Sequence, residues 1–80
     1  MASIMVRVVG SDGRPRSSER VSVYVYQFGA SGMKEAVYTD SDGEADFDLD
    51  IDTHGEISIY VNGNEKVGRG SVKSEYRITI

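Results

Sequence analysis

One stretch of the chain, residues 44–52, alternates strictly between apolar and acidic side chains. The apolar members are Ala45, Phe47, Leu49 and Ile51, and the acidic members between them are Asp46, Asp48, Asp50 and Asp52. Because a β-strand turns successive side chains to opposite faces, this order buries one face and leaves the other in water. No helical period fits the stretch. It therefore predicts a half-buried β-strand, entered through a tight turn at Asp42-Gly43.

Short β-strand patterns recur about every ten residues along the rest of the chain. Val21, Val23 and Val25 share one face of a second such pattern, and Asn62-Gly63 is the pair that a type I′ hairpin turn prefers. Gly68 and Gly70 weaken a later strand and indicate a bulge or a ragged edge. We expect an all-β, Greek-key β-sandwich of about seven strands, with no helix, at residues 4–9, 20–28, 34–39, 44–51, 56–61, 66–69 and 76–80.

The size of the chain and its lack of cysteine limit what can hold it together. Its 80 residues form a single predicted domain, residues 1–80, and none of them is a cysteine. Stability must then come from a thin apolar core and a well-paired sheet, without disulfides or thiolate metal sites. The N-terminus is too short and too polar for a signal peptide, and no apolar run could cross a bilayer. As written, the sequence predicts a soluble cytoplasmic protein with no membrane partner; a module excised from a larger exported protein would look the same.

Acidic residues are concentrated in the middle of the chain. Residues 40–56 contain eight acidic residues and no Lys or Arg, within a formal net charge of −4. This patch argues against a nucleic-acid partner, because phosphate contacts need Lys and Arg. We interpret it as a solvated strand face that keeps a sheet edge from aggregating. A basic partner or a cation is the alternative.

Several turn and core motifs run in order through residues 4–61. They are Val6-Arg7-Val8, Gly13-Arg14-Pro15, Val21-Ser22-Val23-Tyr24-Val25-Tyr26, Thr39-Asp40-Ser41-Asp42-Gly43-Glu44-Ala45-Asp46-Phe47 and Gly55-Glu56-Ile57-Ser58-Ile59. In this order they resemble the transthyretin-like, or prealbumin-like, sandwiches, which include the carboxypeptidase regulatory-like domains. The resemblance implies a transthyretin-like topology and a non-catalytic structural or recognition module. Because these motifs describe turns and core, they specify fold more than function.

The residues present argue against an enzyme. The transthyretin-like family includes hydrolases of 5-hydroxyisourate, which carry active-site histidines, an arginine and a C-terminal Tyr-Arg-Gly-Ser. Here the only histidine is His54, and Tyr76-Arg77 is followed by Ile-Thr-Ile. The carboxylates of residues 46–50 form a flat ladder spaced by about 7 Å, whereas a glycosidase places two carboxyl groups across a cleft. We predict no enzymatic activity, no catalytic residue and no cofactor.

The aspartates around Gly43 and the single histidine, His54, are the candidates for binding a metal ion. Asp40, Asp42 and Asp46 surround Gly43, but the register of an EF-hand loop would give its first and last ligand positions to Tyr38 and Leu49. A regular EF-hand is thereby excluded, and an irregular weak calcium site is left as the alternative to a turn whose aspartates bond the local backbone. We interpret His54 as an exposed turn residue. The sequence predicts no metal site.

Aromatic residues form the candidate binding surface. If Val21, Val23 and Val25 face the core, the alternate residues Tyr24, Tyr26 and Phe28 lie on the outer face, and Tyr60 joins them from a later strand. Exposed aromatics at alternate positions are typical of binding surfaces, and tyrosines can stack on sugar rings. The alternative is cross-strand packing, with Lys and Arg stems lying over the rings. The sequence predicts a module for an unknown protein or carbohydrate, bound at this surface.

The last strand has the pattern of a half-buried strand, with Tyr76, Ile78 and Ile80 on one face. The glycine-broken strand before it is a weak partner, so we expect it to pair with residues 4–9 or 20–28. If this strand lies at a sheet edge, its unpaired N–H and C=O groups can form hydrogen bonds with a strand of a second chain. Any homodimer is therefore expected to form by edge-strand pairing.

Overall fold

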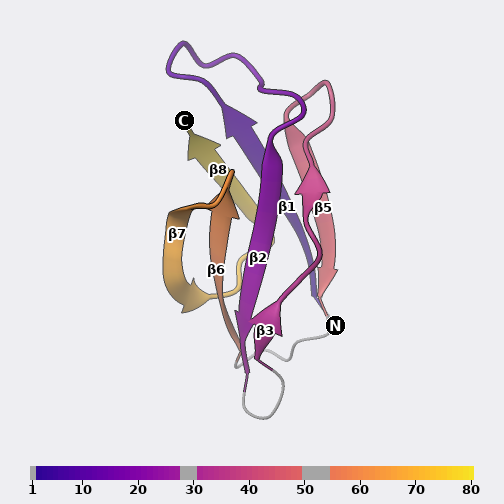
Figure 1. Cartoon of the computed structure of the whole chain (residues 1–80), viewed down its shortest axis with the longest axis vertical. Helices are drawn as coiled ribbons and strands as arrows, with labels where there is room; N and C mark the ends of the chain where they lie inside the picture. The colour runs from indigo at the N-terminus through magenta and orange to yellow at the C-terminus, as the bar shows by residue number, and fades with distance from the viewer. Residues whose placement is uncertain (1, 28–30, 50–54) are drawn as a thin grey trace.

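The computed structural model describes residues 2–27, 31–49 and 55–80, which form eight β-strands in two sheets (Figure 1). The all-β sandwich predicted from the sequence is confirmed. In chain order, the strands are β1 (Ala2–Val9), β2 (Arg20–Tyr26), β3 (Gly32–Met33), β4 (Val37–Tyr38), β5 (Glu44–Leu49), β6 (Glu56–Val61), β7 (Asn64–Ser71) and β8 (Glu75–Thr79). No helix in these ranges is long and apolar enough to span a membrane.

The smaller sheet has three strands in the order β5-β1-β8. β1 and β5 run antiparallel, with Ile4 opposite Phe47, while β1 and β8 run parallel, with Val8 beside Ile78. The prediction that the last strand pairs with one of the first two is therefore confirmed. Among the described strands, β5 and β8 are the two edges of this small sheet.

The larger sheet has the order β3-β2-β6-β7, and β4 also pairs with β2. Its centre is the antiparallel pair β2–β6, in which Val23 lies opposite Ile59. The pairing of β6 with β7 changes register on both sides of Ile59, which confirms the irregularity predicted from the glycines. β7 is nevertheless longer than the predicted 66–69, because the Asn62-Gly63 turn starts the pairing at Asn64.

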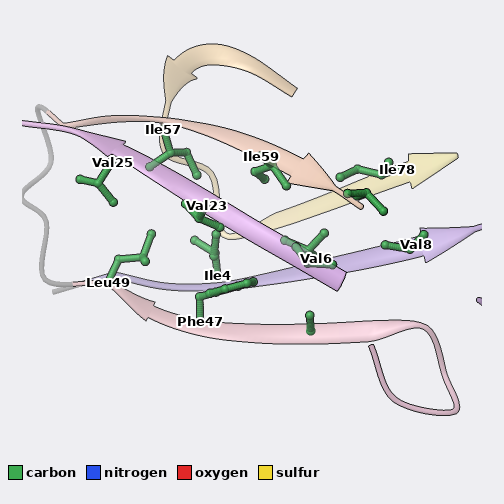
Figure 2. Close-up of a cluster of buried hydrophobic side chains, with 13 residues drawn as sticks. Ile4, Val6, Val8, Val23, Val25, Phe47, Leu49, Ile57, Ile59 and Ile78 are labelled. Atoms are coloured by element: carbon green, nitrogen blue, oxygen red, sulfur yellow. The ribbon is translucent and has the colours of Figure 1, made fainter. Parts of the chain in front are cut away.

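The core lies between the two sheets, where apolar side chains from alternate positions meet (Figure 2). Burying one such side chain contributes about 1.5–3 kcal/mol, so these residues carry most of the stability. The members with the lowest exposure come from both sheets, and every predicted inward residue in the described ranges is at least half-buried. The core cluster consists of Ile4, Val6, Val8, Val21, Val23, Val25, Ala45, Phe47, Leu49, Ile57, Ile59, Val61 and Ile78.

The prediction of one continuous strand over residues 34–39 is wrong. The segment forms two short strands, β3 and β4, which pair with β2 at different points: Met33 lies opposite Tyr24, and Tyr38 lies opposite Arg20. The two registers differ by one residue, as they do when a bulge inserts an extra residue into an antiparallel pair. The predicted strand ends at Phe28 and Ile51 lie outside the described residues.

Hydrogen bonds to Thr39, which is buried next to β4, hold the end of the long loop between β1 and β2. The Thr39 hydroxyl group donates a 2.6 Å hydrogen bond to the carbonyl oxygen of Arg16 and accepts a 2.9 Å bond from the N–H of Glu19. The N–H of Thr39 also donates to the carbonyl of Glu19. One threonine thus ties the end of the loop to the strand that precedes β5.

Candidate binding surface

The outer face of the large sheet carries the predicted tyrosines. Since Val23 and Val25 point into the core, the alternate residues Tyr24 and Tyr26 of β2 point outward, and the register places Tyr60 of β6 on the same face. All three tyrosine side chains are half-buried. The structure therefore brings together three of the four predicted residues, and the fourth, Phe28, lies outside the described residues.

The three tyrosines cover small polar residues of the same face. Ser22 lies opposite Tyr60, and Ser58 lies opposite Tyr24, yet the two serines are only 3% and 0% exposed. The hydroxyl groups of Ser58 and Tyr26 are 3.0 Å apart and hydrogen-bonded. The larger rings thus lie across the smaller side chains, and this packing holds them in place.

Arg69 of β7 completes the cover over Tyr26. Its guanidinium carbon lies 4.4 Å from the centre of the Tyr26 ring, which is cation–π geometry. Its Nε donates a 2.7 Å hydrogen bond to Oε1 of Glu56. At Tyr26 the alternative given in the sequence analysis, a basic side chain lying over the ring, is therefore present. Beside it, the rings of Tyr24 and Tyr26 have centres 4.7 Å apart and planes tilted by 49°.

The surroundings of Tyr60 shift the ionisation of its hydroxyl group. Its hydroxyl group donates a 3.3 Å hydrogen bond to Oε2 of Glu65. Partial removal from water raises the pKa of Tyr60, and the negative charge of Glu65 raises it further, because both disfavour the phenolate. The hydroxyl group therefore stays a hydrogen-bond donor over the whole physiological range.

Three further residues belong to this surface and were not predicted. Met33 and Tyr38 are 54% and 62% exposed, and the register places them on the same face, opposite Tyr24 and Arg20. Arg69 is the third. We call the set Tyr24, Tyr26, Tyr38, Tyr60, Met33 and Arg69 the tyrosine face. Alternation with Val37, which packs against the core, is a signal that could have placed Tyr38 on the outer face. The sequence pattern did not place Arg69, because it leaves the register of the glycine-containing strand β7 undefined and that register shifts twice against β6.

The acidic residues lie on the outer face of the other sheet. Asp46 and Asp48 of β5 are exposed, as predicted, and the Ser3 hydroxyl group donates a 2.7 Å hydrogen bond to Asp48. Glu44 is paired with Arg7 of β1, and this hydrogen bond raises the pKa of Arg7. Asp50, Asp52 and His54 lie outside the described residues.

Asp40, in the turn before β5, bonds the local backbone. One carboxylate oxygen of Asp40 accepts hydrogen bonds from the N–H groups of Asp42 and Glu44, at 2.9 and 3.0 Å. This is the local arrangement that favours Asp in turns. Within residues 2–27, 31–49 and 55–80, no three metal-ligating side chains gather in one place.

Comparison of the chain with protein-family models gives no match, and comparison with curated proteins gives none either. The tyrosine face is therefore interpreted from its own geometry and chemistry.

Proposed function

We propose that this chain is a non-catalytic recognition module that binds a protein partner through the tyrosine face. The observation that carries the proposal is the gathering of four tyrosines, a methionine and an arginine on one side of the large sheet. Tyr, Met and Arg are the residue types enriched at protein interfaces, and Tyr and Arg are frequent among the residues that dominate binding energy.

The packing beneath the rings supports this proposal. Tyr26 is held by Ser58 from below and by Arg69 from above, and Tyr60 is held by Glu65. A side chain that is already fixed loses little conformational entropy when a partner binds, which favours affinity. Met33 and Tyr38 add more accessible apolar surface at the margin of the face.

The sequence supports the same class of module. The motifs that resemble transthyretin-like and regulatory-like domains extend over residues 4–61, and they include the strand that carries Tyr24 and Tyr26. We accordingly propose a transthyretin-like, Greek-key connection of the strands. In such modules a sheet face or edge presents side chains to another protein, with no chemistry on a bound substrate.

A comparative pull-down tests the protein partner. The immobilised domain is incubated with lysate of the source organism, and captured proteins are quantified for wild type and for the double variant Met33→Ala/Tyr38→Ala. Because both side chains are more than half exposed, the variant should fold normally. Arg14→Ala is the matched control, since the Arg14 side chain is 86% exposed and lies in the loop between β1 and β2.

The expected result is a protein captured by wild type and by Arg14→Ala, and lost with Met33→Ala/Tyr38→Ala. Equal capture by all three forms would contradict a role for the tyrosine face. Absence of any specifically captured protein would contradict the proposal of a protein partner.

A carbohydrate is the second candidate ligand, and one observation favours it. Glu56 and Glu65 place carboxylates next to Tyr26 and Tyr60, and carboxylates beside an aromatic ring can accept hydrogen bonds from sugar hydroxyls. The 49° tilt between Tyr24 and Tyr26 argues against a flat platform for several stacked sugars. NMR titration with oligosaccharides distinguishes this candidate: saturable shifts confined to the tyrosine face would favour it over a protein partner.

A further inference from the structure

Methionine supplies all of the sulfur in this chain. The sequence contains three methionines and no cysteine. A peroxide reacts readily with an accessible thiolate where a protein has one, and it also converts accessible methionine thioethers to sulfoxides. Because this chain offers no thiolate, the place of each methionine in the fold decides where such an oxidant acts.

Met33 is open to water. It belongs to β3, which is an edge of the large sheet among the described strands, and it is 54% exposed. Met5, in the central strand of the small sheet, is only half-buried but lies between β5 and β8. Met1 lies outside the described residues. Of the two described methionines, Met33 is therefore the one that an oxidant in solution reaches more easily.

Met33 is also a member of the tyrosine face. The register sets it directly opposite Tyr24, and side chains opposite one another in an antiparallel pair have Cβ atoms about 4.5–5.5 Å apart. A polar group formed on the Met33 sulfur would stand next to Tyr24, within the surface proposed to receive a partner. Oxidation at this one atom would thus change the chemistry of that surface.

The fold does not depend on the Met33 side chain. Neither the core cluster nor the half-buried apolar residues packed against it include Met33. β3 is held to β2 by backbone pairing at Gly32 and Met33, and the N–H of Lys34 donates a 2.8 Å hydrogen bond to the carbonyl of Val23. An oxygen added to the exposed sulfur removes none of these backbone bonds, so the sandwich should stay folded.

We propose that Met33 is a reversible oxidation site, and that its conversion to the sulfoxide by hydrogen peroxide weakens binding at the tyrosine face. The effect on binding rests on the proposed function. In the reaction, a lone pair of the Met33 sulfur attacks one peroxide oxygen and the O–O bond breaks. That oxygen becomes the S=O oxygen, and the other leaves as water after proton transfer. The sulfur loses two electrons and the peroxide gains them.

The sulfoxide is a poorer contact for a partner than the thioether. A thioether side chain is flexible and apolar, so it adapts to the surface packed against it. The sulfoxide oxygen is a hydrogen-bond acceptor, and burying an acceptor that finds no donor weakens binding by about tenfold. Methionine sulfoxide reductases return the sulfoxide to the thioether, which makes the change reversible.

Timed exposure to hydrogen peroxide, followed by peptide mass spectrometry, tests the site itself. In the folded domain Met33 should gain one oxygen atom faster than Met5, and in concentrated urea the two should react at similar rates. Circular dichroism and the melting temperature should stay close to those of the untreated domain. Equal rates at Met33 and Met5 in the folded domain, or unfolding as Met33 reacts, would overturn the proposal.

The effect on binding is tested with the lysate capture, using a domain from which peroxide has been removed. Capture should fall by about tenfold in step with the sulfoxide fraction at Met33, and it should return after treatment with sulfoxide reductases for both epimers and a thiol reductant. Met5→Leu is the matched control, because it removes the half-buried sulfur of the other sheet by a substitution that keeps volume. It should capture as wild type does, before and after peroxide.

The outcomes separate this proposal from the proposed function. If the domain with oxidised Met33 captures as much as the untreated domain, while Met33→Ala/Tyr38→Ala captures nothing, the tyrosine face stands and control by oxidation is wrong. A loss of capture that follows the sulfoxide fraction at Met1 or Met5 instead also overturns it. If the untreated domain captures no protein, the proposed function fails, and the effect of oxidation on binding fails with it.

Discussion

The backbone of Gly43 lies so close to Val8 that a Cβ atom at residue 43 would be 2.5 Å from the Val8 carbonyl oxygen. In the other direction, the N–H of Val8 donates a 2.7 Å hydrogen bond to the carbonyl of Gly43. The φ angle of Gly43 is +76°, in the left-handed region. Two independent requirements, backbone conformation and space, thus call for glycine at the turn that leads into β5.

Gly43→Ala should destabilise the fold more than Gly63→Ala does. Both residues have positive φ angles, a conformation that costs a non-glycine residue about 1–2 kcal/mol. Only residue 43 adds a close contact, because a Cβ at Gly63 would have nothing within 4 Å. Urea unfolding of the two variants measures the difference. Equal losses of unfolding free energy would show that the turn can move away from the Val8 carbonyl without weakening its pairing with β1.

Phe47→Ala should reduce the unfolding free energy by about 3–5 kcal/mol, as deletion of a buried phenylalanine usually does. Phe47 is 6% exposed and packs in the core opposite Ile4. Asp46→Ala is the matched control on the same strand, since its side chain is exposed and should change stability by less than about 0.5 kcal/mol. Thermal melts at low protein concentration compare the two; similar melting temperatures would contradict the placement of Phe47.

Thr39→Val should destabilise the sandwich by about 1–3 kcal/mol, because the carbonyl of Arg16 and the N–H of Glu19 both lose their partner. Thr39→Ser keeps the hydroxyl group and should recover most of this loss. Hydrogen exchange by mass spectrometry adds a local readout: residues 16–19 should exchange faster in the valine variant. Unchanged exchange would mean that the loop is held by other contacts.

The pKa of Tyr60 should lie above its ordinary value of about 10, and Glu65→Gln should lower it. As pH rises through this ordinary value, the unfolded chain releases the Tyr60 proton first. The contribution of the raised Tyr60 pKa to the free energy of unfolding is therefore complete below the unfolded-state pKa, and it is lost as pH rises through the folded-state pKa. NMR titration of a labelled tyrosine ring measures the pKa in both proteins, and Tyr60→Phe assigns the resonance. A pKa in Glu65→Gln equal to that of wild type would remove Glu65 as a cause.

The residues that alternate strictly were also the ones that could be placed from the sequence. In β5, the aspartates and the apolar residues occupy the predicted faces, because strand geometry leaves no other arrangement. The same holds for Tyr24, Tyr26 and Tyr60. The partial burial of these three rings does not follow from alternation alone, because it depends on Ser22 and Ser58 being small enough to lie beneath them.

The segment between β2 and β5 could not be placed, for a physical reason. Residues 32–36 alternate weakly, and the extra residue between β3 and β4 is accommodated by local geometry that composition does not encode. Arg69 is a similar case. The register of β7 against β6 shifts by two residues in total between Tyr60 and Ile57, so the turn at Asn62-Gly63 does not by itself give the position from which Arg69 lies over Tyr26.

The parallel pairing of β1 and β8 also determines when this protein can fold during synthesis. Met5 lies beside Glu75, although 70 residues separate them along the chain. A growing chain cannot complete the small sheet until β8 has left the ribosome, so β1 is made first and must wait for one of its two neighbours. Contacts between such distant residues slow folding because a large loop must close before they form. In the interval, one edge of β1 has backbone N–H and C=O groups that are unpaired, and such edges make incompletely folded chains prone to aggregation.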